Sequence, residues 1–296
     1  MNRLIAGLLL AAALHGAVPD SAQGKIRIVS STTDLGSIAS RVGGDLVEVQ
    51  AIARPNSDVH RVEALPSHMV RVSRARLYLK VGLGLDGWAD PIIDGSRNDE
   101  LTVLDCSAGL EILEKPEGKV DASMGDVHPG GNPHYWLDPR NGAIVASSIA
   151  EALSRIDPAN APAYRQRAER FAEETEKVLA EGQRLLADIP SRDIVSYHAS
   201  WVYLARAFDL NVRGTIEPIP GIPPPGRHLR ELVDLFRRST ILAVLQEPYF
   251  SDEAGAFLAR EAGARIVKIS PSCDTTEPDS YLAHFDTFLR ALAAAE

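Results

Sequence analysis

Short apolar runs alternate with amphipathic segments along most of the chain. A first series has apolar runs at 26–31, 47–53 and 77–82, and a second series has runs at 193–197, 210–216, 241–247 and 264–270. Strands that alternate with helical patterns are typical of crossover units, in which parallel strands form a sheet covered by helices. The pattern predicts an α/β fold with two lobes, each with a mainly parallel central sheet flanked by helices.

The stretch 162–189 separates the two series and has the composition of one long helix. It is rich in Ala, Glu, Arg and Leu, and it contains a single glycine, Gly182. Pro162 at its first turn and Pro190 just beyond its end are typical of helix boundaries. A helix of this length spans about 40 Å. It is either a plain surface helix or a rigid connection that restricts the lobes to small tilts.

The N-terminus has the pattern of a secretory signal peptide, with Arg3 before the apolar run 4–14 and small residues after it. The run is shorter than the roughly 20 apolar residues that span a bilayer. A lipid anchor would need a cysteine at the cleavage point, and the first cysteine is Cys106. We expect an exported, periplasmic protein without a lipid anchor; a buried N-terminal helix is the alternative. The predicted parts are a signal peptide at 1–23, a first lobe at 24–161, the connecting helix at 162–189 and a second lobe at 190–296.

Composition excludes one class of partner. The hydrophobic share of 45% and the charged share of 24% are those of an ordinary globular protein. The formal net charge of −9 argues against nucleic acid, which requires a basic surface. The two cysteines, Cys106 and Cys273, would in an oxidising compartment form one disulfide or remain as two buried thiols, and the sequence leaves both alternatives open.

Candidate chemistry lies where predicted strands end. His60 follows the run 47–53, His198 follows 193–197, and His134 lies in a turn fixed by glycines and prolines. In open α/β sheets the ligand crevice lies beyond the carboxyl ends of the strands. Asp274 follows a strand of the second lobe in the same way. Three imidazoles and one carboxylate, two from each lobe, form a tetrahedral set suited to Zn²⁺, although each residue alone has an ordinary structural interpretation.

The other histidines outside the leader have weaker signals. His68, His228 and His284 fall within helical patterns, and we interpret them as structural. His128 lies in the short loop before His134. It belongs either to a loop that meets the metal first or to a solvated turn.

The proline-rich segment 217–226 contains five prolines, which fix φ and remove five amide donors. We expect a rigid extended connection at the interlobe side or at the surface.

These contexts resemble the zinc and manganese substrate-binding proteins of ABC importers, a family with a rigid helix between two α/β lobes. The resemblance runs from about Lys25 to Leu292. It rests on DVHRVEALPS around His60, NPHYWLDP around His134, SYHASWVYLARAF around His198, the EPIPGIPPPGRHLRELVDLF segment, and QEPYFS around Glu247.

The resemblance implies that His60, His134 and His198 bind the metal and that an acidic residue of the C-terminal loop completes the site. Asp274 matches that position, with Asp279 and Glu277 as substitutes. Manganese-type members place a carboxylate where this chain has His198, so the imidazoles favour zinc.

The resemblance also implies partners. The transported ligand would be Zn²⁺, the partner the membrane permease of an ABC importer, and the chain a monomer. Zinc-type members often carry a long histidine-rich loop before the NPH motif, whereas the loop here is short. We therefore hypothesise a periplasmic helper protein that hands over zinc.

Two rival functions remain. One is a zinc hydrolase, because three histidines and an open position can activate water, with Glu247 as the nearby acidic candidate for a general base. The other is a manganese-binding or adhesin-type member of the same fold.

Overall fold

The computed structural model describes residues 24–294, which are built around two four-stranded sheets whose strand pairings are all parallel. The first sheet has the order β2-β1-β3-β4, with β1 (Ile26–Ser30), β2 (Val47–Ala51), β3 (Leu77–Lys80) and β4 (Thr102–Asp105). The second has the order β6-β5-β7-β8, with β5 (Asp193–Ser196), β6 (Asn211–Thr215), β7 (Ala243–Gln246) and β8 (Ile266–Lys268). The predicted α/β fold with two parallel sheets is confirmed.

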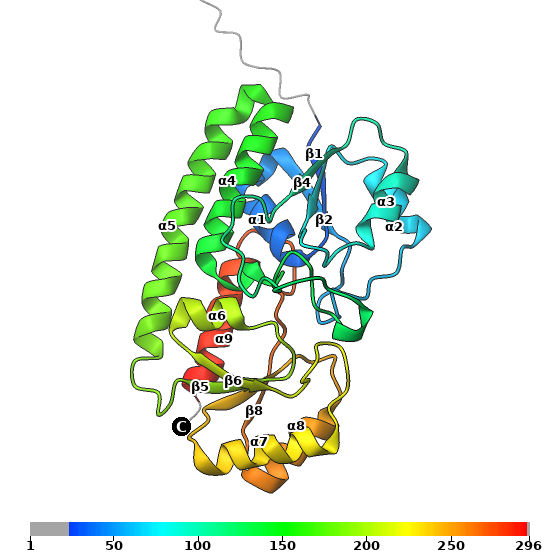
Figure 1. Cartoon of the computed structure of the whole chain (residues 1–296). Coiled ribbons are helices and arrows are strands. Elements are labelled where there is room, and N and C mark those ends of the chain that lie inside the picture. Colours follow the sequence, from blue (N-terminus) through cyan, green and yellow to red (C-terminus); the bar gives the residue numbers. More distant parts are fainter. Residues whose placement is uncertain (1–23, 295–296) are drawn as a thin grey trace, which may run out of the picture.

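Helices cover both sheets, which is why the central strands are apolar. β3 and β7 are almost entirely buried, whereas the edge strands β4 and β6 have exposed positions. Around the first sheet lie α1 (Thr33–Gly43), α2 (Pro66–Val72) and α3 (Ala89–Ser96), and around the second lie α6 (Val202–Phe208), α7 (Gly226–Arg238) and α8 (Asp252–Ala262) (Figure 1). Short 3₁₀ turns occur at η1 (Gly44–Leu46), η2 (Ala122–Met124), η3 (Tyr135–Leu137) and η4 (Pro158–Asn160).

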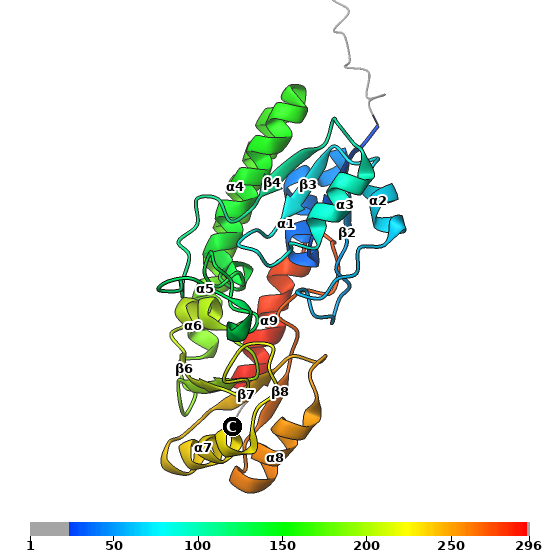
Figure 2. The same ribbon diagram turned by 45° about the vertical axis from the view of Figure 1, so that its right-hand side comes forward.

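Three long helices lie along the two lobes. α4 (Pro139–Ile156) packs against α5 (Ala161–Leu185), and α9 (Ser280–Ala293) packs against both α5 and α1. α5 extends from the outer end of the first lobe to the loop before β5, and α9 lies beside it (Figures 1 and 2). The last helix therefore belongs to the contact between the lobes as much as to the second lobe.

The connecting helix is shorter than predicted. The sequence suggests 162–189, whereas α5 has 25 residues and ends at Leu185. Pro162 occupies the first turn as expected. At Leu186 the chain leaves the helix, with its N–H still bonded to the Gly182 carbonyl, and its side chain is fully buried. The helix therefore ends before Pro190, at the point where the Leu186 side chain enters the core.

One apolar core extends through both lobes. It contains Ile28 and Leu79 of the first sheet, Phe171 of α5, Leu245 of the second sheet and Phe288 of α9. Two smaller clusters lie elsewhere in the lobes. Because a close-packed core resists separation, its continuity supports the expectation that the lobes tilt by small amounts.

The ends of the chain and its cysteines complete the description. The signal peptide expected at 1–23 lies outside the described residues. Within residues 24–294, none of the helices combines the length and the hydropathy that crossing a membrane requires. Cys106 and Cys273 are free, buried thiols, so the second alternative left by the sequence is the one observed.

Candidate metal centre

Three histidines from separate segments meet where the two lobes face each other. His60 lies in the loop between β2 and α2, His134 immediately precedes η3, and His198 follows β5. Each offers a ring nitrogen, and these atoms all lie within 4.8 Å of one another. The structure thus brings together the three histidines that the sequence singles out.

The spacing of the three rings matches a shared ion. The ring centroids of His60 and His134 are 5.2 Å apart, those of His60 and His198 5.3 Å, and those of His134 and His198 5.8 Å. Two imidazoles bound to one tetrahedral ion at a Zn–N distance of about 2 Å have centroids about 5 Å apart. Little rearrangement is needed to place an ion among them.

A hydrogen bond at Nδ1 orients each ring. The acceptors are Asp58 Oδ1 for His60 (2.8 Å), Asn132 Oδ1 for His134 (3.0 Å) and Glu217 Oε2 for His198 (2.8 Å). Such bonds hold the proton on Nδ1 and leave Nε2 free for a metal. His60 Nε2 is buried and has no hydrogen-bond partner among the described residues, an arrangement that native proteins normally avoid. An ion bound at Nε2 would relieve that cost.

Burial keeps the centre ready for a cation. His134 and His198 are only 3% and 4% exposed. Burial lowers the pKa of His134 well below its ordinary value, and the neighbouring His60 and His198 lower it further. Because only the neutral imidazole binds a metal, His134 is competent at neutral pH without releasing a proton.

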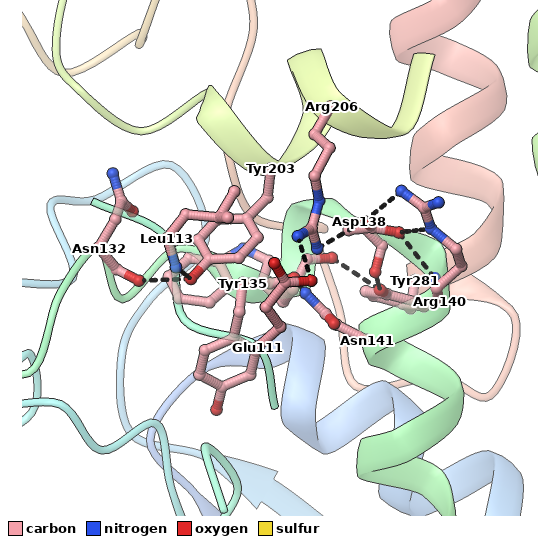
Figure 3. A network of polar contacts seen from close by, with 11 residues as sticks. Glu111, Leu113, Asn132, Tyr135, Asp138, Arg140, Asn141, Tyr203, Arg206 and Tyr281 are labelled. Atoms are coloured by element: carbon pink, nitrogen blue, oxygen red, sulfur yellow. Dashed lines mark hydrogen bonds and ion pairs between the residues drawn. The ribbon is translucent and has the colours of Figure 1, made fainter. Parts of the chain in front are cut away.

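Polar contacts anchor the His134 turn to the second lobe (Figure 3). Tyr203 of α6 donates to the Asn132 carbonyl oxygen at 3.0 Å. The Asn132 side chain donates to the Ala199 carbonyl at 2.7 Å and accepts from the His134 N–H at 3.1 Å. The residue that orients His134 is therefore also bonded to the segment that carries His198.

Further polar contacts connect the segment after His134 to α4, α6 and α9. The fully buried carboxylate of Asp138 pairs with Arg140 at 2.8 Å and with Arg206 of α6 at 3.3 Å. Tyr281 of α9 donates to the Trp136 carbonyl at 2.6 Å. We call these contacts the rear network, consisting of Asn132, Trp136, Asp138, Arg140, Tyr203, Arg206 and Tyr281. Figure 3 labels all of these residues except Trp136. The rear network holds the His134 turn against three helices.

Asp274 is not part of the histidine group. It is exposed in the loop after β8 and lines a different cavity, of about 450 Å³, together with Lys268 and His284. Glu277 and Asp279, the substitutes considered from the sequence, are exposed in the same loop. The structure does not bring any of the three carboxylates among the ring nitrogens.

The reason is that this loop docks on α1. The Cys273 N–H donates to Asp34 Oδ1 at 3.0 Å, and Thr33 Oγ1 donates to the Cys273 carbonyl at 2.6 Å. Asp279 pairs with Arg41 of α1 at 2.9 Å. Because Asp274 follows a strand, the sequence correctly predicted that it lies near the contact between the lobes. The sequence did not predict that its loop packs against α1.

The remaining histidines divide into two kinds. The helical ones have structural surroundings: His68 in α2, His228 in α7 with Nε2 bonded to the Thr215 carbonyl at 2.8 Å, and His284 in α9 with Nε2 bonded to the Ser270 carbonyl at 2.9 Å. His128 is different, because its ring stacks on His60 with centroids 5.3 Å apart. It lies at the metal centre and not in a remote solvated turn.

Glu247, the acidic candidate for a hydrolytic base, is enclosed by residues that follow His198 in the chain. It is fully buried, and its Oε1 accepts from Ser200 Oγ at 2.9 Å and from Trp201 Nε1 at 3.0 Å. Burial raises its pKa to about 8. A general base must reach the proton it abstracts, so this enclosure does not favour the hydrolase.

Comparison with known proteins identifies the family. The family model described as "ZnuA: Zinc-uptake complex component A periplasmic" matches residues 28–295. The chain belongs to this family. Its members are metal-binding substrate-binding proteins that work with the permeases of ABC transporters.

Relatives in the family are named for different metals. The chain is 28% identical to the iron-binding protein YfeA of Yersinia pestis over 264 residues, which cover 87% of this chain and 81% of the relative. It is 23% identical to the manganese ABC transporter substrate-binding lipoprotein PsaA of Streptococcus pneumoniae, over 98% of this chain and 94% of the relative. It is 22% identical to the zinc-binding lipoprotein AdcA of the same species, over 92% of this chain and 56% of the relative.

Solved structures confirm the architecture. A crystal structure of ZnuA superposes with a TM-score of 0.79 at 26% identity, covering 92% of this chain and 99% of that one. The structure of FpvC from Pseudomonas aeruginosa in complex with Mn²⁺ has the same fold, with a TM-score of 0.77 at 23% identity, over 92% of this chain and 98% of that one.

Proposed function

We propose that this protein captures Zn²⁺ between its lobes in the periplasm and delivers it to the membrane permease of an ABC importer. The observation that supports zinc is the set of three imidazoles from His60, His134 and His198, each with Nδ1 already committed to an oxygen acceptor. Their three Nε2 atoms are then the ligands.

Ligand chemistry is the argument for zinc over manganese. Imidazole nitrogen suits Zn²⁺, whereas Mn²⁺ prefers carboxylate, carbonyl and water oxygen. Carboxylates do surround the centre, but Asp58 and Glu217 are engaged with ring nitrogens and act from outside the ligand set. Their negative charge offsets part of the charge of the bound ion without supplying a manganese-type ligand.

Capture would replace the water ligands of the ion by ring nitrogens from both lobes. Because Glu217 of the second lobe orients His198 and Asp58 of the first lobe orients His60, a small tilt between the lobes changes the distance between these two ligands. We propose such a tilt as the step that releases zinc to the permease. The short loop before His134 supports the further proposal of a helper protein that supplies zinc.

Metal competition on the purified chain tests the proposal. The metal-free protein is titrated with Zn²⁺ and with Mn²⁺, and the two ions are then competed against each other while binding heat is measured. We expect one ion per chain and a preference for zinc of at least about 100-fold, as expected for an all-nitrogen site. Equal affinity, or a preference for manganese, would refute the zinc assignment and favour the manganese-type alternative.

A further inference from the structure

A short loop of the first lobe crosses to the second lobe beside the metal centre. We call residues 121–131 the latch loop. The Asp126 N–H donates to the carbonyl of Pro220 at 2.9 Å, within the proline-rich segment of the second lobe. The Asp126 carboxylate also lies 3.9 Å from Arg61, next to His60. The latch loop therefore touches both the far lobe and the His60 loop.

Two glycines make this contact close. Gly125 and Gly221 face each other across the lobes with φ of 68° and 77°, in the left-handed region that favours glycine. A Cβ at Gly125 would lie 2.2 Å from the Pro220 carbonyl oxygen, and a Cβ at Gly221 would lie 2.1 Å from Asp126 Oδ2. The absence of both side chains is what allows the two backbones to approach. The backbones of two segments far apart in the sequence are therefore closely packed here.

The latch loop carries His128 to the centre. Its ring lies 5.3 Å from that of His60, within the range of 5.2 to 5.8 Å found among the three ligands. Its Nε2, like that of His60, is buried and without a hydrogen-bond partner among the described residues. Together with His134 and His198, His128 lines a cavity of about 300 Å³. A cation bound between these two neighbouring nitrogens would satisfy both.

We propose that His128 supplies the fourth nitrogen of the centre, so that Zn²⁺ is held by four imidazoles and the latch loop closes over it. The inference rests on the proposed function. His60 and His128 are stacked at 22°, whereas the ligand pairs are inclined at 52° to 76°. Binding therefore requires the His128 ring to turn toward the ion. Gly84, which lies beside this ring, has no side chain to obstruct it.

Among the described residues, no carboxylate joins the three histidines as a fourth ligand. Asp274, the residue favoured by the sequence, is exposed and lines a separate cavity. Four neutral nitrogens complete the tetrahedral coordination that zinc prefers. A ligand on a loop that spans the lobes would also couple occupancy of the site to lobe closure.

The test counts imidazoles. Zinc-loaded wild type, His128→Ala and Asp274→Ala are compared by X-ray absorption at the zinc edge and by zinc affinity against a chelator. We expect four imidazoles in the wild type. His128→Ala should show three imidazoles and one oxygen, with affinity lowered more than about tenfold, while Asp274→Ala matches the wild type.

Several outcomes separate the claims. Three imidazoles in the wild type with unchanged affinity in His128→Ala would overturn the fourth ligand and leave the proposed function intact. Failure of the wild type to bind zinc would instead defeat the proposed function. His128→Asn serves as a second variant if the alanine variant fails to fold, and circular dichroism verifies folding in each case.

The latch itself is tested with a matched pair of glycines. Gly125→Ala obstructs the contact with Pro220, whereas Gly118→Ala also lies at positive φ, 109°, but has nothing within 4 Å. We expect Gly125→Ala to raise the zinc dissociation rate about tenfold, as displacement of a ligand-bearing loop should, and Gly118→Ala to leave it unchanged. The double variant with Gly125→Ala and His128→Ala should release zinc at the same rate as His128→Ala alone. Equal rates in the two glycine variants would refute the latch.

Discussion

The two sides of the metal centre are built differently. On one side the rear network fixes the His134 turn through buried groups, including the Asp138 carboxylate, which has no exposed area. On the other side the latch loop meets the second lobe through one backbone hydrogen bond from Asp126, and its ion pair partner Arg61 is 67% exposed. The difference indicates that the rear-network side of the site is rigid and that the latch-loop side can open.

Magnitudes support this division. An exposed ion pair contributes about 0–1 kcal/mol, and one hydrogen bond contributes about 1 kcal/mol. The latch contact of Asp126 is therefore small compared with the stability of a whole domain. Opening the latch side at such a cost would give a metal ion a route in, while the rear network keeps His134 and His198 in register. The predictions below probe the two sides of the centre, in order of expected effect.

The largest effect should come from removing a ligand fixed by the rear side. His134→Ala and His198→Ala each should weaken zinc binding by more than about 100-fold, because deletion of a ligand exceeds the 10- to 100-fold cost of losing an outer partner. By the same argument, His60→Ala should weaken zinc binding by more than about 100-fold. Chelator competition measures all three. Wild-type affinity in any two variants would contradict the assignment.

Breaking the rear network should destabilise the fold. Asp138→Ala removes two ion pairs and the side-chain cap of α4, which accepts from the Arg140 N–H. We expect the free energy of unfolding to fall by about 2 kcal/mol. Glu111→Ala is the control, because Glu111 pairs with the same Arg206 but is 78% exposed, so its loss should change little. Urea denaturation that gives equal losses would show that burial is not what matters here.

A milder change concerns the orientation of His198 by Glu217, which lies in the segment that the latch loop contacts. Glu217→Gln keeps an acceptor for Nδ1 but removes the negative charge. Zinc affinity should fall by about tenfold. Glu231→Gln, an exposed and remote change in α7, provides the comparison. If calorimetry finds the two variants alike, Glu217 does not tune the centre.

The smallest effect is a slope with pH. Burial raises the pKa of Glu247 to about 8. Between its ordinary value of 4.5 and 8 the folded protein therefore keeps a proton that the unfolded chain has lost. The contribution of Glu247 to the free energy of unfolding is full below pH 4.5. Between pH 4.5 and 8 it is lost as pH rises, by about 1 kcal/mol per pH unit. Glu247→Gln should lack this slope when the metal-free proteins are unfolded at pH 6 and pH 7. A parallel decline in both proteins would contradict the assignment.

Much of the architecture could be predicted from the sequence. Alternating apolar runs located seven of the eight strands, and their order implied two parallel sheets. The three histidines that the structure brings together were singled out because each lies at a strand end or a fixed turn. Apolar runs, strand ends and turns depend on neighbouring residues in the sequence, which is why the sequence alone could predict them.

What the sequence did not reveal depends on contacts between distant segments. α4 and β4 were not singled out, although α4 packs against the connecting helix. The end of α5 was set by burial of Leu186, and Asp274 was drawn away by the docking of its loop on α1. The position of His128 depends on two glycines of different lobes that meet in space. None of these leaves a periodic signal.

The most direct test of the central claim is anomalous diffraction at the zinc edge from crystals of the zinc-loaded protein. We predict one strong peak between the lobes, about 2 Å from Nε2 of His60, His134 and His198. A peak bound to carboxylates away from these rings, or no peak among them, would contradict the account.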